Sequence, residues 1–324
     1  MPHAHGAHGA DAAPAAHNRA HCTPGLRALS YRFVVCCDDA SLGTYVSGLL
    51  RSLRSGDEVD SGDVARYEVS SSSSSSSSRP GCVDVHRDGE IVVLDVPPGD
   101  AVATLVWDIN RLAAERSGEY LLFHSGGLEA AGGAGLLVPA ASGSGKSTLT
   151  AGLAQAGLGY LSDELVALEL DGAAPGRLLP YPKPITVKPG SFTALASLDP
   201  GPFGDGWFGE SSDVAGVGAG AGGDQAEWQV PVGEGTGRQV GSPCRPAYVI
   251  VPRYDAGAET ALTRLSETEA FFSLALHAVN MLPHGADATA ALGRLAADCE
   301  CYALAMSDLD AACALVLGLV GARV

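Results

Sequence analysis

The stretch Gly135-Leu-Leu-Val-Pro-Ala-Ala-Ser-Gly-Ser-Gly-Lys-Ser-Thr-Leu149 is an apolar run that breaks into a glycine-rich loop and then resumes as a helix. In loops of this composition, glycines such as Gly143 and Gly145 let backbone N–H groups close around phosphate oxygens. Lys146 adds a positive charge, and Ser147 offers a hydroxyl to a magnesium ion. The stretch therefore predicts a site for the phosphates of a nucleotide such as ATP, together with Mg²⁺.

The residues after the loop have helical spacing. Apolar side chains predict a helix over 147–157, and its N-terminus adds positive potential for an anion. Ala140 stands where the G-x-x-x-x-G-K-[ST] pattern has its first glycine. An ordinary turn with Lys146 in solvent is the alternative. The predicted nucleotide-binding residues here are Ser142, Gly143, Ser144, Gly145, Lys146, Ser147 and Thr148.

Two adjacent acids, Asp163 and Glu164, follow inside the otherwise apolar stretch 159–168. Carboxylates in apolar surroundings need a partner, and a magnesium ion held between Ser147 and one acid would supply it. The other acid would then orient or deprotonate an attacking hydroxyl. We assign the proton to Asp163 and the metal side to Glu164, and the reverse assignment stays open. The short interval predicts that the acid-bearing strand lies near the strand that feeds the loop.

His124 precedes Lys146 by 22 residues, and Asp163 and Glu164 follow Lys146 by 17 and 18. Together with the Ala-Ala-Ser-Gly-Ser-Gly-Lys-Ser loop, this spacing resembles the kinase domain of the HPr kinase/phosphorylase family. That family has a histidine ahead of a G-x-S-G-x-G-K-S loop and a pair of acids at the same two distances. Two positions depart from it: Ala140 replaces the leading glycine, and Glu164 stands where the family usually has Asp.

The resemblance covers residues 124–189 most closely and extends loosely from residue 30 to the end. It implies an α/β fold of the phosphoenolpyruvate-carboxykinase-like P-loop type, with a mixed sheet and C-terminal helices. It also implies ATP-dependent phosphorylation of a hydroxyl, a serine of a peptide or small protein such as the precursor of a peptide natural product. His124 would support the base. Related enzymes also remove phosphate by phosphorolysis, and this direction stays open.

Basic residues after the acids complete the predicted site. Lys183 stands where related kinases place a basic residue, and with Lys188 it is a candidate for contact with the transferred phosphate; a solvated lysine is the alternative. Arg253 ends the strand predicted at 246–254 and suits bidentate contact with phosphate, although a surface ion pair fits equally. The predicted catalytic residues are Asp163, Glu164, His124 and Lys183, and the predicted metal ligands are Ser147, Asp163 and Glu164.

Two other functions fit the same loop. A transport-type or regulatory ATPase would share it, but such proteins carry a second signature such as LSGGQ, which this sequence lacks. A nucleotide-binding scaffold inside a biosynthetic complex would keep the loop without turnover. Consumption of ATP without a phosphorylated product would favour the ATPase, and binding of nucleotide without turnover would favour the scaffold.

Charge and cysteine content limit the partners and the compartment. A formal net charge of −17 argues against nucleic acid or an anionic membrane surface as a partner, because both require clustered Lys and Arg. No apolar run approaches the roughly 20 residues of a membrane span, and no segment resembles a secretory leader. The eight cysteines include no C-x-x-C pair, so we interpret them as reduced, mostly buried thiols of a cytoplasmic protein. Related bacterial enzymes often assemble into rings, so the resemblance also allows a homo-oligomer.

We expect three parts in the chain. Residues 1–28, rich in Ala, Gly, His and Pro, form a disordered tail, since such a composition buries too little apolar surface. Residues 29–118 form an α/β portion that extends the sheet of the core and carries a flexible serine-rich loop at 70–78. Residues 119–324 form the kinase domain, in which a glycine-rich stretch at about 197–243 is a flap near the substrate or a linker.

Periodicity predicts the elements between these landmarks. Asp88-Gly89 is a two-residue hairpin turn between alternating strands. A short strand should end at His124, and β-branched and aromatic runs predict further strands at 30–37 and 246–254. Helices are expected at 38–53, 101–116, 147–157, 267–281, 287–297 and 307–317.

Overall fold

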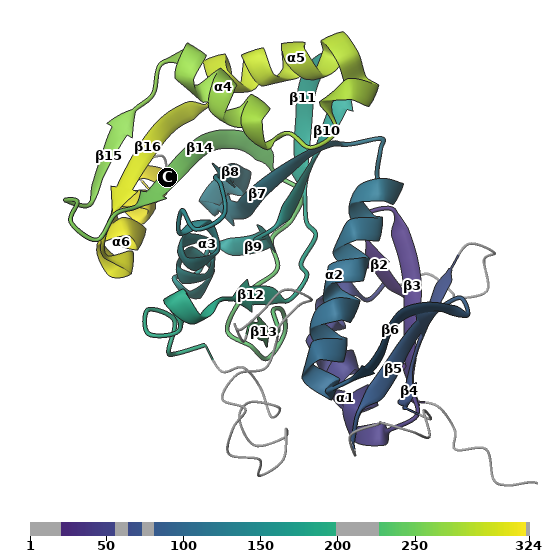
Figure 1. The fold of residues 1–324 in the computed structure, drawn as a ribbon. Coiled ribbons are helices and arrows are strands. Elements are labelled where there is room, and N and C mark those ends of the chain that lie inside the picture. The colour runs from purple at the N-terminus through teal and green to yellow at the C-terminus, as the bar shows by residue number, and fades with distance from the viewer. Residues whose placement is uncertain (1–20, 56–63, 73–80, 199–226, 322–324) are drawn as a thin grey trace, which may run out of the picture.

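The computed structural model describes residues 21–55, 64–72, 81–198 and 227–321. They form an α/β protein with two separate mixed sheets, and helices at the C-terminal end pack on the larger one (Figure 1). The expected α/β class, with a mixed sheet and C-terminal helices, is confirmed. None of the described helices is long and apolar enough to cross a membrane.

The N-terminal unit is a six-stranded sheet in the order β1-β3-β4-β5-β6, with β2 paired to β3. The β3–β4 pair is parallel and the other pairs are antiparallel. The Asp88-Gly89 turn joins β5 to β6 as predicted. The elements are β1 (His21–Cys22), β2 (Leu26–Ala28), β3 (Tyr31–Cys37), α1 (Ala40–Leu49), η1 (Arg51–Leu53), β4 (Ala65–Ser71), β5 (Val83–Arg87), β6 (Glu90–Val96) and α2 (Pro98–Arg116).

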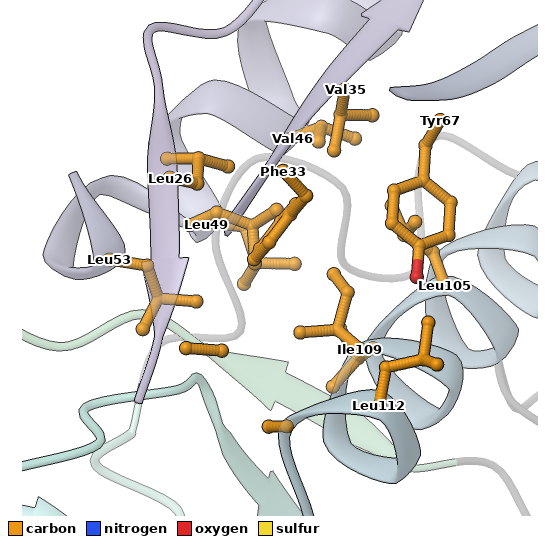
Figure 2. Close-up of a cluster of buried hydrophobic side chains, with 14 of the residues drawn as sticks. Leu26, Phe33, Val35, Val46, Leu49, Leu53, Tyr67, Leu105, Ile109 and Leu112 are labelled. Carbon is orange, nitrogen blue, oxygen red and sulfur yellow. The ribbon is translucent and has the colours of Figure 1, made fainter. Parts of the chain in front are cut away.

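Helix α2 covers one face of this sheet. Leu105, Ile109 and Leu112 recur at helical spacing and form one apolar stripe. They belong to the same buried cluster as Phe33 and Tyr67 of the sheet, as Figure 2 shows. Because this stripe packs on the N-terminal sheet, the other side of α2 is left to face the rest of the protein.

The larger sheet has eight strands in the order β11-β10-β7-β8-β14-β16-β15, with β9 paired to β7. Strands β8, β14 and β16 are parallel, and the other pairs are antiparallel. The elements are β7 (Leu121–Ala130), η2 (Ala131–Gly133), β8 (Ala134–Pro139), α3 (Lys146–Gln155), β9 (Gly159–Ser162), β10 (Leu165–Asp171), β11 (Ala174–Leu179), β12 (Ile185–Val187), η3 (Pro189–Ser191), β13 (Trp228–Val230), β14 (Arg245–Tyr254), β15 (Ala261–Arg264), α4 (Glu267–His277), α5 (Met281–Asp298), β16 (Glu300–Met306) and α6 (Leu309–Gly321). Strands β12 and β13 form a separate short pair.

Side chains on the larger sheet point alternately to its two faces, and a different pair of helices covers each face. On β8, Leu136 and Val138 pack in the cluster that includes α3 and α6, whereas Leu137 packs in the cluster that includes α4 and α5. Tyr248 and Val249 of β14 divide in the same way. Successive strand residues point to opposite faces, so a strand covered on both faces needs a continuous apolar run. Figure 1 shows α3 and α6 on the opposite side of the sheet from α4 and α5.

The two sheets meet through α2. Leu122 of β7 and Leu165 and Ala167 of β10 belong to the same buried cluster as the apolar stripe of α2. The expectation that the N-terminal part extends the core sheet is therefore wrong, since no strand of one sheet pairs with the other among the described residues. The chain leaves the N-terminal unit at the end of α2, Arg116, and enters the larger sheet at the start of β7, Leu121. Residue 118, the end of the predicted N-terminal portion, lies in this interval.

The predicted tail differs from the structure at its C-terminal end. Residues 1–20 lie outside the described residues, but 21–28 are not disordered: β1 and β2 both pair with β3, and Leu26 is buried. Cys22 forms a disulfide with Cys36. Pairing and cross-linking to β3 supply order that composition does not reveal. The two cysteines are thus not the reduced thiols expected, whereas the other six form no disulfide and are buried.

The C-terminal part of the glycine-rich stretch expected at about 197–243 is structured. Residues 199–226 of the stretch, like 73–78 of the serine-rich loop, lie outside the described residues. Residues 227–243 are not a structureless segment, because β13 pairs with β12 and Val230 and Val232 enter the buried cluster beneath α3.

Candidate active site

The loop after β8 makes the sharp connection to α3 that the sequence predicts. Gly143 and Gly145 have φ angles of 82° and 88°, which strain residues other than glycine. Gly145 is the N-cap of α3, so the N–H groups of the first helical turn, which lack helical partners, open toward the loop. The Tyr254 N–H at the end of β14 donates to the Ser144 carbonyl at 3.0 Å, which ties the loop to this strand. The loop thus presents backbone donors and a helix N-terminus to an anion.

Lys146 begins α3 and is only 5% exposed. Its ammonium donates to the main-chain carbonyl of Asp163 at 3.1 Å, and the described residues offer it no carboxylate salt bridge. Burial lowers the pKa of Lys146, against the opposing charges of Glu164 and Asp163. An ammonium held by one carbonyl keeps donors for a second ligand. Phosphate oxygens would supply the counter-charge that this buried group lacks.

A cavity of about 1020 Å³ lies next to the loop. The loop and α3 line it on one side, α2 lines it on another, and β12 and its neighbours close it. Pockets for single drug-sized ligands measure roughly 300–1,000 Å³. The cavity therefore has room for a nucleotide and for part of a second substrate.

Strand order puts different groups on the two sides of the loop. Strand β8, which feeds the loop, lies between β7 and β14. His124 and Glu164 line the cavity from the β7–β10 side, and Tyr254 and Met306 line it from the ends of β14 and β16. We call these the acid side and the tyrosine side. Phosphates on the loop would lie between them.

Glu164 is the acid that faces the cavity. Its side chain is 43% exposed, and its Oε1 lies 3.3 Å from Nδ1 of His124. Burial alone favours the protonated acid, but the hydrogen bond from His124 and the charges of Lys183 and Lys146 lower the pKa of Glu164 to about 2. The carboxylate is therefore ionised at neutral pH, as a base or a metal ligand must be.

Asp163 is fully buried and does not line the cavity. Its Oδ1 accepts a hydrogen bond from the Tyr160 hydroxyl at 2.7 Å and lies 2.7 Å from Nζ of Lys183. Its Oδ2 accepts from the Thr186 N–H at 3.2 Å. Lys183 is equally buried, and these two charges neutralise each other inside the protein. The geometry therefore fits neither assignment in full: Glu164 alone of the two acids faces the cavity, as a base or a metal ligand, while Asp163 and Lys183, expected as catalytic residues, lie behind the cavity wall because they are buried against each other.

Most of the other predicted residues come together at the cavity. Ser144 does not line it, because its hydroxyl donates back to the Ala141 carbonyl at 2.7 Å. Arg253 does not line it either: its side chain is 76% exposed and lies 4.0 Å from Asp255, the surface ion pair that was the alternative. The predicted residues that line the cavity are Ser142, Gly143, Gly145, Lys146, Ser147, Thr148, His124, Glu164 and Lys188.

Sequence reasoning missed the part of the wall that α2 provides. Trp107 lines the cavity and is 61% exposed, and the Arg111 guanidinium lies 5.9 Å from the centre of its ring. Arg111 is held in turn by Asp108, at 2.7 Å. The one available signal was the place of Trp107 in α2, away from the apolar stripe that packs on the N-terminal sheet.

The residues present fit a magnesium ion that is bound mainly through phosphate. The described residues include no group of three or more His, Cys, Asp and Glu side chains that could hold a metal alone. Mg²⁺ is commonly bound by one or two protein groups together with substrate phosphates and water. Ser147 and Glu164 both line the cavity and could serve as those groups.

The chain was compared with family models and with curated proteins. No family model matches the chain, and no curated protein matches it. The loop, the cavity and the acid side are therefore the basis for a functional proposal.

Proposed function

We propose that this chain is a kinase that uses ATP and Mg²⁺ to phosphorylate a hydroxyl, a serine of a peptide or small protein. The observation that carries the proposal is a single cavity that is lined both by a phosphate-binding loop with a buried lysine and by an ionised carboxylate paired with a histidine. A nucleotide-binding protein without transfer chemistry has no need of the second feature.

Each group has a role that its surroundings support. The loop N–H groups and Lys146 bind the phosphates and neutralise the charge that develops on them. Glu164 accepts the proton of the acceptor hydroxyl or helps Ser147 to hold the metal, and His124 orients its carboxylate. Magnesium, when bound, supplies further charge neutralisation and orients the phosphates. Asp163 and Lys183 have a structural role, because their buried ion pair fixes the backbone next to Glu164.

The family and fold remain part of the proposal. Spacing of the histidine, loop and acids supports a relation to the HPr kinase/phosphorylase family and its phosphoenolpyruvate-carboxykinase-like P-loop fold. We propose a cytoplasmic location, where ATP is available. Assembly into a homo-oligomer is compatible with the relation.

A nucleotide-binding scaffold or ATPase is the second candidate. It is favoured by the sequestration of Asp163, which leaves only Glu164 of the acid pair facing the cavity.

Mass spectrometry of candidate acceptors incubated with Mg²⁺ and ATP separates these functions. Serine-containing peptides should gain one phosphate with the wild type and lose this gain with Glu164→Gln. The matched control is Glu169→Gln, on β10 outside the cavity, where Glu169 pairs with Arg177. Binding of ATP without turnover would favour the scaffold, and release of ADP without a phosphorylated acceptor would favour the ATPase.

A further inference from the structure

An exposed apolar surface begins at the acid side of the cavity. Phe272 and Leu276 lie one helical turn apart on α4, Val279 follows the end of α4, and Leu282 lies in the first turn of α5. Leu276 is 81% exposed and Leu282 95%. We call these four residues the α4–α5 patch.

The patch is joined to the site through Val279, which lines the cavity and is 53% exposed. Helix α4 ends at His277, earlier than the predicted 281, because the next residues pair with β7. The Val279 N–H donates to the Leu122 carbonyl at 2.8 Å, and Ala278 forms a bridge with Phe123. The residue that follows Phe123 in β7 is His124. The patch thus starts beside the pair of His124 and Glu164.

Strand order indicates which substrate would cover this surface. Val279 lies against β7, on the acid side of the loop, and the exposed ring of Trp107 lines the same cavity. Phosphates on the loop leave the tyrosine side for the rest of the nucleotide, because the acid side must admit the hydroxyl that is phosphorylated. Val279 at the acid side therefore faces the acceptor, and Trp107 lines the same cavity.

Resting on the kinase function proposed above, we infer that the acceptor is a peptide segment with large apolar side chains next to its serine, which binds along Trp107, Val279 and the rest of the α4–α5 patch. Exposed apolar side chains that gather beside a cavity are typical of binding sites. A second copy of this chain fits less well, since standard interfaces use roughly 20–30 residues a side and this patch is small and runs into the cavity.

Peptide binding tests the inference without requiring phosphoryl transfer. The probes are two pools of short fluorescein-labelled peptides with a central serine, one flanked by Leu, Phe and Val and one by Gln, Thr and Gly. Fluorescence anisotropy is measured with Mg²⁺ and a non-hydrolysable ATP analogue present. The variants are Leu276→Asp and Leu282→Asp. The control is Ile91→Asp, an exposed apolar position at 65% on the N-terminal sheet.

The apolar pool should bind the wild type better than the polar pool, and each patch variant should weaken its binding about tenfold while the control does not. Equal binding of both pools, or unchanged binding by the patch variants, would overturn the inference. A wild-type dimer that the patch variants convert to monomer in sedimentation would also overturn it, in favour of a second copy. A parallel incubation of the same peptides with Mg²⁺ and ATP tests the kinase function separately: apolar peptides that bind at the patch but gain no phosphate there would support the docking surface and count against the kinase function.

Discussion

Asp163 and Glu164 are neighbours in the chain, yet their carboxylates have different surroundings. Asp163 is fully buried against Lys183, and Glu164 reaches the cavity. The sequence predicts the pair but not its division, because Lys183 and Thr186 approach Asp163 only through the folded path of the chain. Residue spacing can locate a charged pair, whereas the partner of each charge depends on tertiary contacts.

A matched pair of substitutions separates the two roles. Asp163→Asn removes the counter-charge of buried Lys183 and should lower the free energy of unfolding by about 3–5 kcal/mol. Glu164→Gln breaks a partly exposed contact and should change stability by about 1 kcal/mol or less while abolishing transfer. Thermal unfolding and phosphate incorporation measure both. Equal stability of the two variants would contradict the buried role of Asp163.

Lys146 should dominate the binding of phosphate. Lys146→Ala removes a buried ammonium next to the loop, and the rate of transfer should fall on the order of 10²-fold or more. Lys188→Ala is the control, because Lys188 also lines the cavity but its side chain is 61% exposed and lies 3.8 Å from Glu227. Steady-state rates with ATP measure the effect. Wild-type turnover by Lys146→Ala would rule out the assigned loop.

His124 should control the titration of Glu164. The folded-state pKa of Glu164, about 2, lies below its ordinary value of 4.5, so the ionised form stabilises the fold above pH 4.5 and this contribution is lost as the pH falls toward 2. His124→Ala removes the hydrogen bond that lowers this pKa, so the pKa should rise. Carbon-13 NMR of the Glu164 carboxyl follows both titrations. An unchanged midpoint in the variant would show that His124 does not set the ionisation.

Among the elements, strand β7 is longer than the sequence pattern predicts. The short apolar run that begins at Tyr120 predicts a strand that ends at His124. It continues to Ala130 instead, with His124 opposite Leu165 of β10. By contrast, the hairpin at Asp88, the loop into α3 and the apolar stripe of α2 could all be predicted, because each depends on local residues alone.

Close packing of α3 on β7 explains a glycine in that strand. A Cβ at Gly126 would lie 2.2 Å from Oγ1 of Thr150, which is fixed by its hydrogen bond to the Lys146 carbonyl at 2.8 Å. Gly126→Ala should therefore cost about 1–3 kcal/mol and shift the start of α3, weakening nucleotide binding. Gly118→Ala, where a Cβ meets nothing within 4 Å, is the control. Thermal shifts with and without ATP measure both effects, and equal behaviour of the two variants would contradict this account.

For the whole molecule, the most important missed feature is the place of α2. Periodicity predicts the helix and its apolar stripe, but no local pattern shows that its other side lines the cavity beside the loop with Trp107. That contact joins residues far apart in the chain and depends on the docking of two sheets. The N-terminal unit, which carries no chemical motif, therefore forms part of the candidate site.

Because the two sheets share one buried cluster through α2, they should unfold in one calorimetric transition. Leu121 and Leu122 are adjacent on β7 and both fully buried, but Leu122 packs in the cluster with α2 and Leu121 packs with α4 and α5. Each Leu→Ala change should cost about 2–5 kcal/mol. Only Leu122→Ala weakens the joint between the units, so only this variant should split the transition in two and reduce nucleotide-dependent protection of α2. Two transitions in the wild type, or a split caused equally by Leu121→Ala, would mean that the units fold independently and that α2 closes the cavity without a stabilising contact.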